Sequence, residues 1–346
     1  QKPEARSKMM TGYKICFPPQ GSAGKPEARR KLLASGFWLL ASAFLFLSCG
    51  PQQSTEPAKE SRIVAASGVR VRSEPVETAG EITRLEIGAV VRVLDQSSDW
   101  YRVSTPDGKE GWVFGGLTAP FTASDRDKIY QKIASDRLKA EDASFADLVD
   151  LVRFLSAAAG EVEDRGAKAE LELARLLAMR RALEEIPFEK QQEPAYAEWL
   201  KSHEEDFVYN EPAGQWLVRS DLFWNLREEY SDLPLAEQIT WEAANNPLPG
   251  ECEGYLPCHL AAFNRTLGRY LDLYPGGAHA EEALSDLDES LRVIDGARDA
   301  DYVPDPEERN EARKELNKLR ETISGTSGKE KADLLKLVDD YLKYYG

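Results

Sequence analysis

The stretch that decides the fold begins with Gly68-Val-Arg-Val-Arg-Ser-Glu-Pro75 and continues through Gly88-Ala-Val-Val-Arg-Val-Leu94, Asp99-Trp-Tyr-Arg-Val103 and Pro106-Asp-Gly-Lys-Glu-Gly-Trp-Val113. Apolar and polar side chains alternate in these strings, and a period of two is typical of β-strands with one buried face. Glycines and a Pro-Asp-Gly turn separate them. The pattern predicts five or six short strands in about sixty residues. So small a unit buries enough apolar surface only if the sheet closes on itself, so we expect a small barrel over 62–121.

The order and spacing of these strings resemble the bacterial SH3-like (SH3b) domain family. The Trp-Tyr-x-Val string at 100–103 and the Gly-Trp-Val string at 111–113 carry the resemblance, although Arg70 stands where that family usually has Asn. In related domains, aromatic side chains near these strands help to form a peptide groove. The resemblance therefore makes Trp100, Tyr101 and Trp112 candidate ligand-binding residues. The alternative is that Trp100 and Trp112 pack in the barrel core.

After residue 123 the apolar period changes to 3.6, which predicts an all-helical domain over 122–346. Ser124-x-x-Asp127 and Ser144-x-x-Asp147 have the spacing of helix N-terminal caps. Further helices are expected near 168–186, ended by a proline, and from about 327 onward. No strand pattern is apparent in this region. The expected fold class is thus multi-domain, with a small all-β barrel followed by an all-α array.

Two segments of the helical region, 226–239 and 270–284, resemble each other with Ala236 and Ala280 in register. Each is similar to the junction between tetratricopeptide repeats, where an aromatic helix end and a Pro/Gly turn precede a helix with a small alanine. The offset is 44 residues rather than the roughly 34 of that family, and a loop at 246–258 accounts for the excess. The alternative is a helical array without repeats.

The amino end carries a pattern typical of export signals. Arg29, Arg30 and Lys31 precede an uncharged run over 32–48, which ends at Leu47-Ser48-Cys49-Gly50. This resembles the lipobox of bacterial lipoprotein signal peptides, which implies cleavage before Cys49 and lipidation of its thiol. We therefore expect an N-terminal extension and signal peptide over 1–48 and a polar linker over 49–61. The alternative is an uncleaved anchor helix.

Composition argues against several functional classes. The chain has 44 Lys and Arg against 60 Asp and Glu, a net charge of −16. Binding to nucleic acid by phosphate neutralisation is therefore not expected. With 3 His and 4 Cys, there is little material for a zinc site or a Cys/His nucleophile pair. We expect no catalytic residue, no metal and no cofactor, and we interpret His203 beside Glu204 and Glu205 as a solvated helix face.

Cys252 and Cys258 lie in a Pro/Gly-rich loop, and outside the cytoplasm such a lone pair favours a disulfide. The alternative makes them metal ligands together with His259. A further aromatic cluster is expected to be mostly core, and any exposed part would mark a protein-binding surface. Its members are Trp199, Phe207, Tyr209, Trp216, Phe223, Trp224 and Trp241.

Together these features predict a non-catalytic lipoprotein of the cell envelope that binds cell-wall peptide or an envelope protein. A lipid anchor would hold it to the membrane outside the cytoplasm, at the periplasmic face of the outer membrane if the organism has one. The alternatives are a cell-wall hydrolase or its dedicated regulator, and a purely structural stalk.

Overall fold

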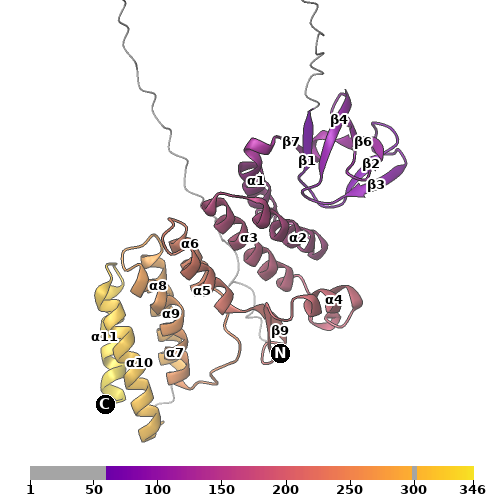
Figure 1. The fold of residues 1–346 in the computed structure, drawn as a ribbon. Coiled ribbons are helices and arrows are strands. Elements are labelled where there is room, and N and C mark those ends of the chain that lie inside the picture. The colour runs from indigo at the N-terminus through magenta and orange to yellow at the C-terminus, as the bar shows by residue number, and fades with distance from the viewer. Residues whose placement is uncertain (1–59, 298–301) are drawn as a thin grey trace, which may run out of the picture. The chain divides into compact units, whose positions relative to one another are not determined.

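The computed structural model describes residues 60–297 and 302–346 (Figure 1). The predicted signal peptide, the linker up to residue 59 and the lipidation site at Cys49 lie outside the described residues. Within the described part of the chain, no helix is long and apolar enough to cross a membrane.

The first folded part is a seven-stranded antiparallel sheet in the order β3-β2-β6-β5-β4-β1-β7. The strands are β1 (Ser61–Val64), β2 (Val69–Arg72), β3 (Glu81–Leu85), β4 (Val90–Ser97), β5 (Trp100–Ser104), β6 (Glu110–Phe114) and β7 (Thr118–Phe121). The alternation places one side chain in two inside a small core. Its buried members are Val64, Val69, Val71, Leu85, Val91, Val103 and Val113.

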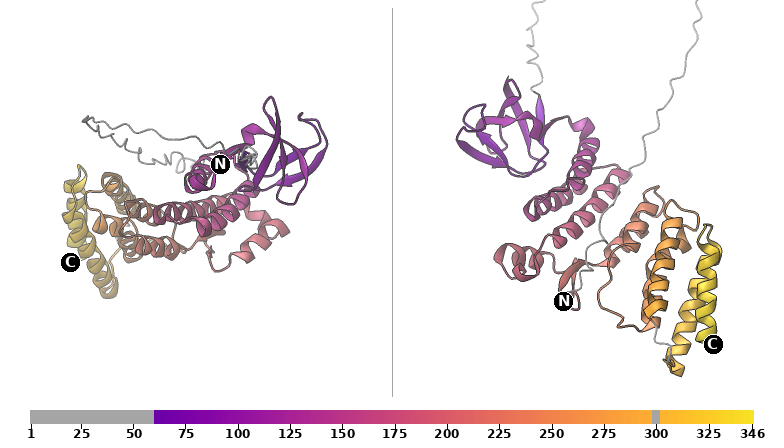
Figure 2. Two further views of the ribbon diagram at one scale, coloured as in Figure 1. Left: turned by 45° about the horizontal axis from the view of Figure 1, so that its top comes forward. Right: turned by 180° about the vertical axis from the view of Figure 1, so that it is seen from behind.

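Helices follow the sheet, so the predicted order of a β domain and a helical domain is confirmed. They are α1 (Arg126–Leu138), α2 (Phe145–Glu161), α3 (Arg165–Glu184), α4 (Pro194–Ser202), α5 (Ser220–Glu229), α6 (Ala236–Ala244), α7 (Leu256–Arg265), α8 (Leu267–Leu273), α9 (Ala280–Ala297), α10 (Pro306–Gly325) and α11 (Lys331–Tyr344). Short 3-10 turns lie at η1 (Gly115–Leu117), η2 (Ala123–Asp125) and η3 (Phe188–Lys190). Near the carboxy end, α10 packs against both α7 and α11, in the orange and yellow part of the ribbon (Figure 2).

One of the two predicted caps is present. The Ser144 hydroxyl accepts from the Asp147 N–H, and the Asp147 carboxylate accepts from the Ser144 N–H, so this capping box starts α2. The cap predicted at Ser124 is wrong, because residues 123–125 form the turn η2 and the N-cap of α1 is Asp125. The 3-10 turn shifts the helix start by one residue.

The expectation that no strand interrupts the helical region is also wrong. Strands β8 (Phe207–Asn210) and β9 (Gln215–Val218) form a hairpin between α4 and α5. Tyr209 lies directly opposite Trp216, and their rings are 5.1 Å apart. Cross-strand aromatic pairs stabilise such short hairpins.

The two segments that resemble each other have the same local structure. In the first, α5 ends before Tyr230, a turn follows, and α6 begins at Ala236. In the second, α8 ends before Tyr274, a turn follows, and α9 begins at Ala280. Both alanines are nearly fully buried, which lets the neighbouring helix approach closely. The loop between the two copies extends from 246 to the start of α7.

Candidate functional site

Three aromatic side chains share one exposed face of the first sheet. Trp100 on β5 lies directly opposite Phe114 on β6, and their rings meet edge to face with centroids 5.6 Å apart. Trp112 is two residues before Phe114 on the same strand, so both side chains point to the same face. Phe114 is 40% exposed and both tryptophans are partly exposed. We call Trp100, Trp112 and Phe114 the aromatic face.

Two arginines lie on the same face as Trp112. Arg102 of β5 and Arg72 of β2 are its direct partners across the strands. Arg102 pairs with Glu110, with 2.9 Å between Nη2 and Oε2, and Arg72 donates to the Ala79 carbonyl over 2.8 Å. The face therefore offers rings to apolar groups, with the Arg72 guanidinium and the exposed Arg102–Glu110 ion pair beside them.

Tyr101 lies on the opposite face of β5, because neighbouring residues of a strand point to opposite sides. Its ring packs against the valine core, and the Arg62 guanidinium carbon lies 4.1 Å from the ring centroid. Arg62 is buried and donates from Nε to the Thr118 hydroxyl over 2.7 Å. The structure thus brings Trp100 and Trp112 together and places Tyr101 apart from them. Phe114 is not among the predicted ligand-binding residues, because its position opposite Trp100 depends on the strand register.

Residues 67–119 match the family model of the bacterial SH3 domain. The match covers the strands that carry the aromatic face and leaves the helices outside it. A comparison with curated proteins found no match to the chain.

In the helical domain, the two cysteines of the described residues form the predicted disulfide. Cys252 and Cys258 are joined, with 5.5 Å between their Cα atoms. Neither sulfur is therefore a free thiol for nucleophilic chemistry or a thiolate for a metal. Among the described residues, no group of three or more His, Cys, Asp or Glu side chains is placed to hold a metal ion.

His203, which the sequence places beside two glutamates, is held by aromatic contacts. Its ring lies 5.1 Å from Trp199 and 5.6 Å from Phe207, and its Nδ1 lies 3.0 Å from the Trp199 carbonyl oxygen. Glu204 and Glu205 are exposed in the turn after α4. These contacts fix the ring as part of a packed aromatic group.

Most of the second aromatic cluster is buried, as the sequence predicts. Its buried members are Trp199, Phe207, Phe223, Trp224 and Trp241. Tyr209 is 37% exposed and Trp216 is partly exposed on the hairpin. The exposed part of the cluster is thus a single cross-strand pair.

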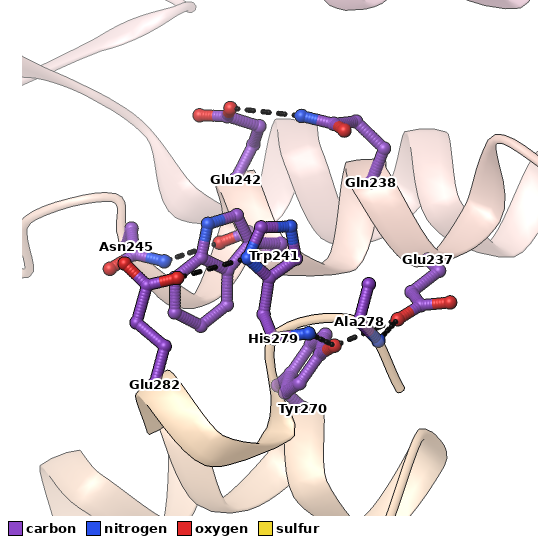
Figure 3. Close-up of polar contacts among 9 residues, drawn as sticks. All are labelled: Glu237, Gln238, Trp241, Glu242, Asn245, Tyr270, Ala278, His279 and Glu282. Atoms are coloured by element: carbon purple, nitrogen blue, oxygen red, sulfur yellow. Dashed lines mark hydrogen bonds and ion pairs between the residues drawn. The ribbon is translucent and has the colours of Figure 1, made fainter. Parts of the chain in front are cut away.

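A polar cluster joins the two helix junctions that resemble each other (Figure 3). Glu237 of α6 accepts from the Tyr270 hydroxyl over 2.9 Å and from the Ala278 N–H over 2.5 Å. The Tyr270 hydroxyl in turn accepts from the His279 N–H over 3.0 Å. The His279 ring stacks on Trp241 with 4.4 Å between centroids and 5° between planes. These contacts hold the turn before α9 against α6, so we assign them a structural role.

Proposed function

We propose that this protein binds cell-wall peptide through the aromatic face of its bacterial SH3 domain. The observation that carries the proposal is the partial exposure of Trp100 and Trp112 on one side of the sheet, together with Phe114. The core of this small sheet domain consists of valines and one leucine, and the three rings lie on the other side of the strands. Exposed aromatic rings of this kind are typical of binding surfaces.

The chemistry of the face suits a peptide with free carboxylates. The rings would cover the apolar parts of the peptide, and its carboxylates would pair with Arg72 and replace Glu110 as the partner of Arg102. The whole chain carries a net charge of −16. The two arginines would therefore be a local positive site on a negatively charged protein, and this site would attract the carboxylates of the ligand. The helical domain would then act as a scaffold that offers a second surface to an envelope protein.

Co-sedimentation of the full chain with purified cell wall tests this function. We expect the wild-type chain to sediment with the wall and the double variant Trp100→Ala/Trp112→Ala to stay largely in the supernatant. The matched control is Tyr209→Ala/Trp216→Ala, which removes the other exposed aromatic pair and should sediment like the wild type. Equal sedimentation of the Trp100/Trp112 variant and the wild type would contradict the proposal.

We further propose that the protein is a lipoprotein held outside the cytoplasm by acylation of Cys49, at the periplasmic face of an outer membrane where one exists. The lipobox-like string ending at Cys49 supports this, and so does the disulfide, because disulfides persist in oxidising compartments. Mass spectrometry of the mature amino terminus is the test. An acylated Cys49 is expected, and an intact leader with an unmodified thiol would refute the anchor.

We also propose that the protein is a binding protein and not an enzyme. Its support lies in the bonded state of Cys252 and Cys258 and in the packed ring of His203. Zymography on cell-wall substrate should show no clearing. Clearing that a single carboxylate substitution abolishes would instead favour a hydrolase.

A further inference from the structure

A pocket of about 460 Å³ lies at the carboxy end of the helical domain, away from the bacterial SH3 domain. Six short segments line it: the disulfide loop, the first turn of α7, the last turns of α9, Tyr302 before α10, the first turn of α10, and α11 with the residue after it. The disulfide ties the loop residues Glu253 and Gly254 to α7 through Cys258. One rim of the pocket is therefore fixed covalently.

Tyrosine rings form much of the pocket wall. Tyr255, Tyr302, Tyr341 and Tyr345 all line it. Tyr341 donates its hydroxyl to the Leu291 carbonyl over 3.0 Å. Aromatic faces attract cations through the ring quadrupole, so a wall of this composition suits a positively charged group.

Glu308, in the first turn of α10, brings a carboxylate to the same pocket. It is only 4% exposed, and it accepts hydrogen bonds from two neutral phenols, Tyr302 and Tyr345. The hydrogen bond to Glu308 raises the pKa of the Tyr302 phenol, and burial raises the pKa of the Tyr345 phenol, so both remain donors. The two phenols are therefore the donors of this group, and the Glu308 carboxylate is their acceptor.

Glu308 differs from Glu242, a comparably buried glutamate of the described chain. Glu242 is 5% exposed and pairs with Arg180, with 2.6 Å between Oε2 and Nη2. Among the described residues that line the pocket there is no lysine or arginine, and burial lowers the pKa of the lining His259, which favours its neutral form. The positive end of α10 offsets part of the buried charge, but Asp305 caps the same helix end. A buried carboxylate is costly unless a cation compensates it.

We propose that this pocket binds a small organic cation, with an alkylammonium group placed between the tyrosine rings and Glu308. The ammonium would donate hydrogen bonds to the carboxylate, and the alkyl chain would lie against Leu256 and Ile294 of the lining. Two sources share this chemistry, a free amine and a lysine side chain of a peptide. The site is independent of the aromatic face, so either can fail without the other.

Isothermal titration of the full chain at constant ionic strength tests the site. The probe is n-butylammonium chloride, and n-butanol is the neutral control of the same length. We expect saturable binding of the ammonium and none of the alcohol. Glu308→Gln removes the charge and keeps one oxygen that can accept from one of the two phenols, so it should weaken binding about tenfold or more. Glu321→Gln, an exposed residue of the same helix, should bind like the wild type.

A second variant keeps the test decisive if Glu308→Gln unfolds. Tyr302 is 47% exposed, so Tyr302→Leu should fold and should weaken binding several-fold through loss of one ring. The peptide acetyl-Gly-Lys-Gly-amide distinguishes the two sources: tighter binding than n-butylammonium assigns the site to a lysine side chain, and weaker binding assigns it to a free amine. Absence of saturable ammonium binding, equal binding of n-butanol, or unchanged affinity in both variants would overturn the proposal.

Discussion

Gly88 and Gly108 place the same demand on the backbone in different surroundings. Their φ angles are +87° and +81°, in the region that favours glycine. A Cβ at Gly88 would lie 2.6 Å from the Phe154 ring of α2, whereas a Cβ at Gly108 would meet no heavy atom within 4 Å. The comparison between them therefore isolates the contact between the sheet and α2.

Replacing each glycine by alanine should destabilise the protein to different extents. Gly108→Ala should cost about 1 kcal/mol of unfolding free energy through backbone strain alone. Gly88→Ala adds overlap with a packed ring, so we expect a further loss of about 1–3 kcal/mol. Urea unfolding followed by tryptophan fluorescence measures both. Equal losses for the two variants would show that Phe154 does not pack on Gly88.

At the residue scale, the sequence predicts the core better than the exposed face. Val69 and Val71 alternate with charged residues, and the structure buries both as predicted. The run Trp112-Val113-Phe114 contains three apolar residues in a row, so alternation cannot say which of them points inward. The structure buries Val113 and leaves its two larger neighbours partly exposed. Strand register, which the sequence does not give, decides the aromatic face.

At the scale of elements, the disulfide loop should contribute measurably to stability. Closing a loop with a sequence separation of 6 corresponds to about 2 kcal/mol in the chain-entropy model. We expect dithiothreitol to lower the urea midpoint of the wild type. The double variant Cys252→Ser/Cys258→Ser should start at the lower midpoint and not respond to the reductant. A wild-type midpoint that the reductant leaves unchanged would contradict this contribution.

Helices α1 and α3 meet at the partly buried carboxylate of Glu170. Its titration should change the free energy of unfolding. Burial raises the pKa of Glu170, against the hydrogen bond that Gln131 donates over 2.6 Å. A raised folded-state pKa favours the protonated form of Glu170. The contribution of Glu170 to the free energy of unfolding is therefore greatest below the ordinary glutamate pKa of 4.5, and it falls as pH rises through the folded-state pKa. Glu170→Gln should therefore raise the thermal midpoint at neutral pH and lose this advantage below pH 4.5.

Circular dichroism across this pH range is the measurement for Glu170→Gln. Glu163→Gln, at an exposed position before α3, serves as the control and should follow the wild type at every pH. A constant offset between Glu170→Gln and the wild type across the whole range would show that the carboxylate does not titrate with folding.

Elements with strong periodicity or caps could be predicted, and short ones could not. The box at Ser144 and the proline after α3 bound their helices as expected. The β8–β9 hairpin has two strands of four residues, too short for alternation to distinguish them from loop. Its cross-strand pair, Tyr209 and Trp216, becomes apparent only when the two strands are aligned.

At the scale of the whole molecule, the sequence predicts the order of the domains but not the pocket between helices. The pocket brings Tyr255, Glu308 and Tyr345 together from three distant parts of the chain. Each of these residues looks ordinary in its local sequence, and their chemistry arises only from packing. The bacterial SH3 domain is the opposite case, because its motifs lie within one short segment.

We expect the aromatic face of the bacterial SH3 domain to contact cell-wall peptide. Nuclear magnetic resonance of the tryptophan indole N–H groups, titrated with soluble cell-wall peptide, tests it most directly. The chain has 7 tryptophans. We expect saturable shifts of the indole N–H signals of Trp100 and Trp112, while the signals of Trp199 and Trp241 stay unchanged. Binding that saturates without moving the Trp100 and Trp112 signals would contradict it.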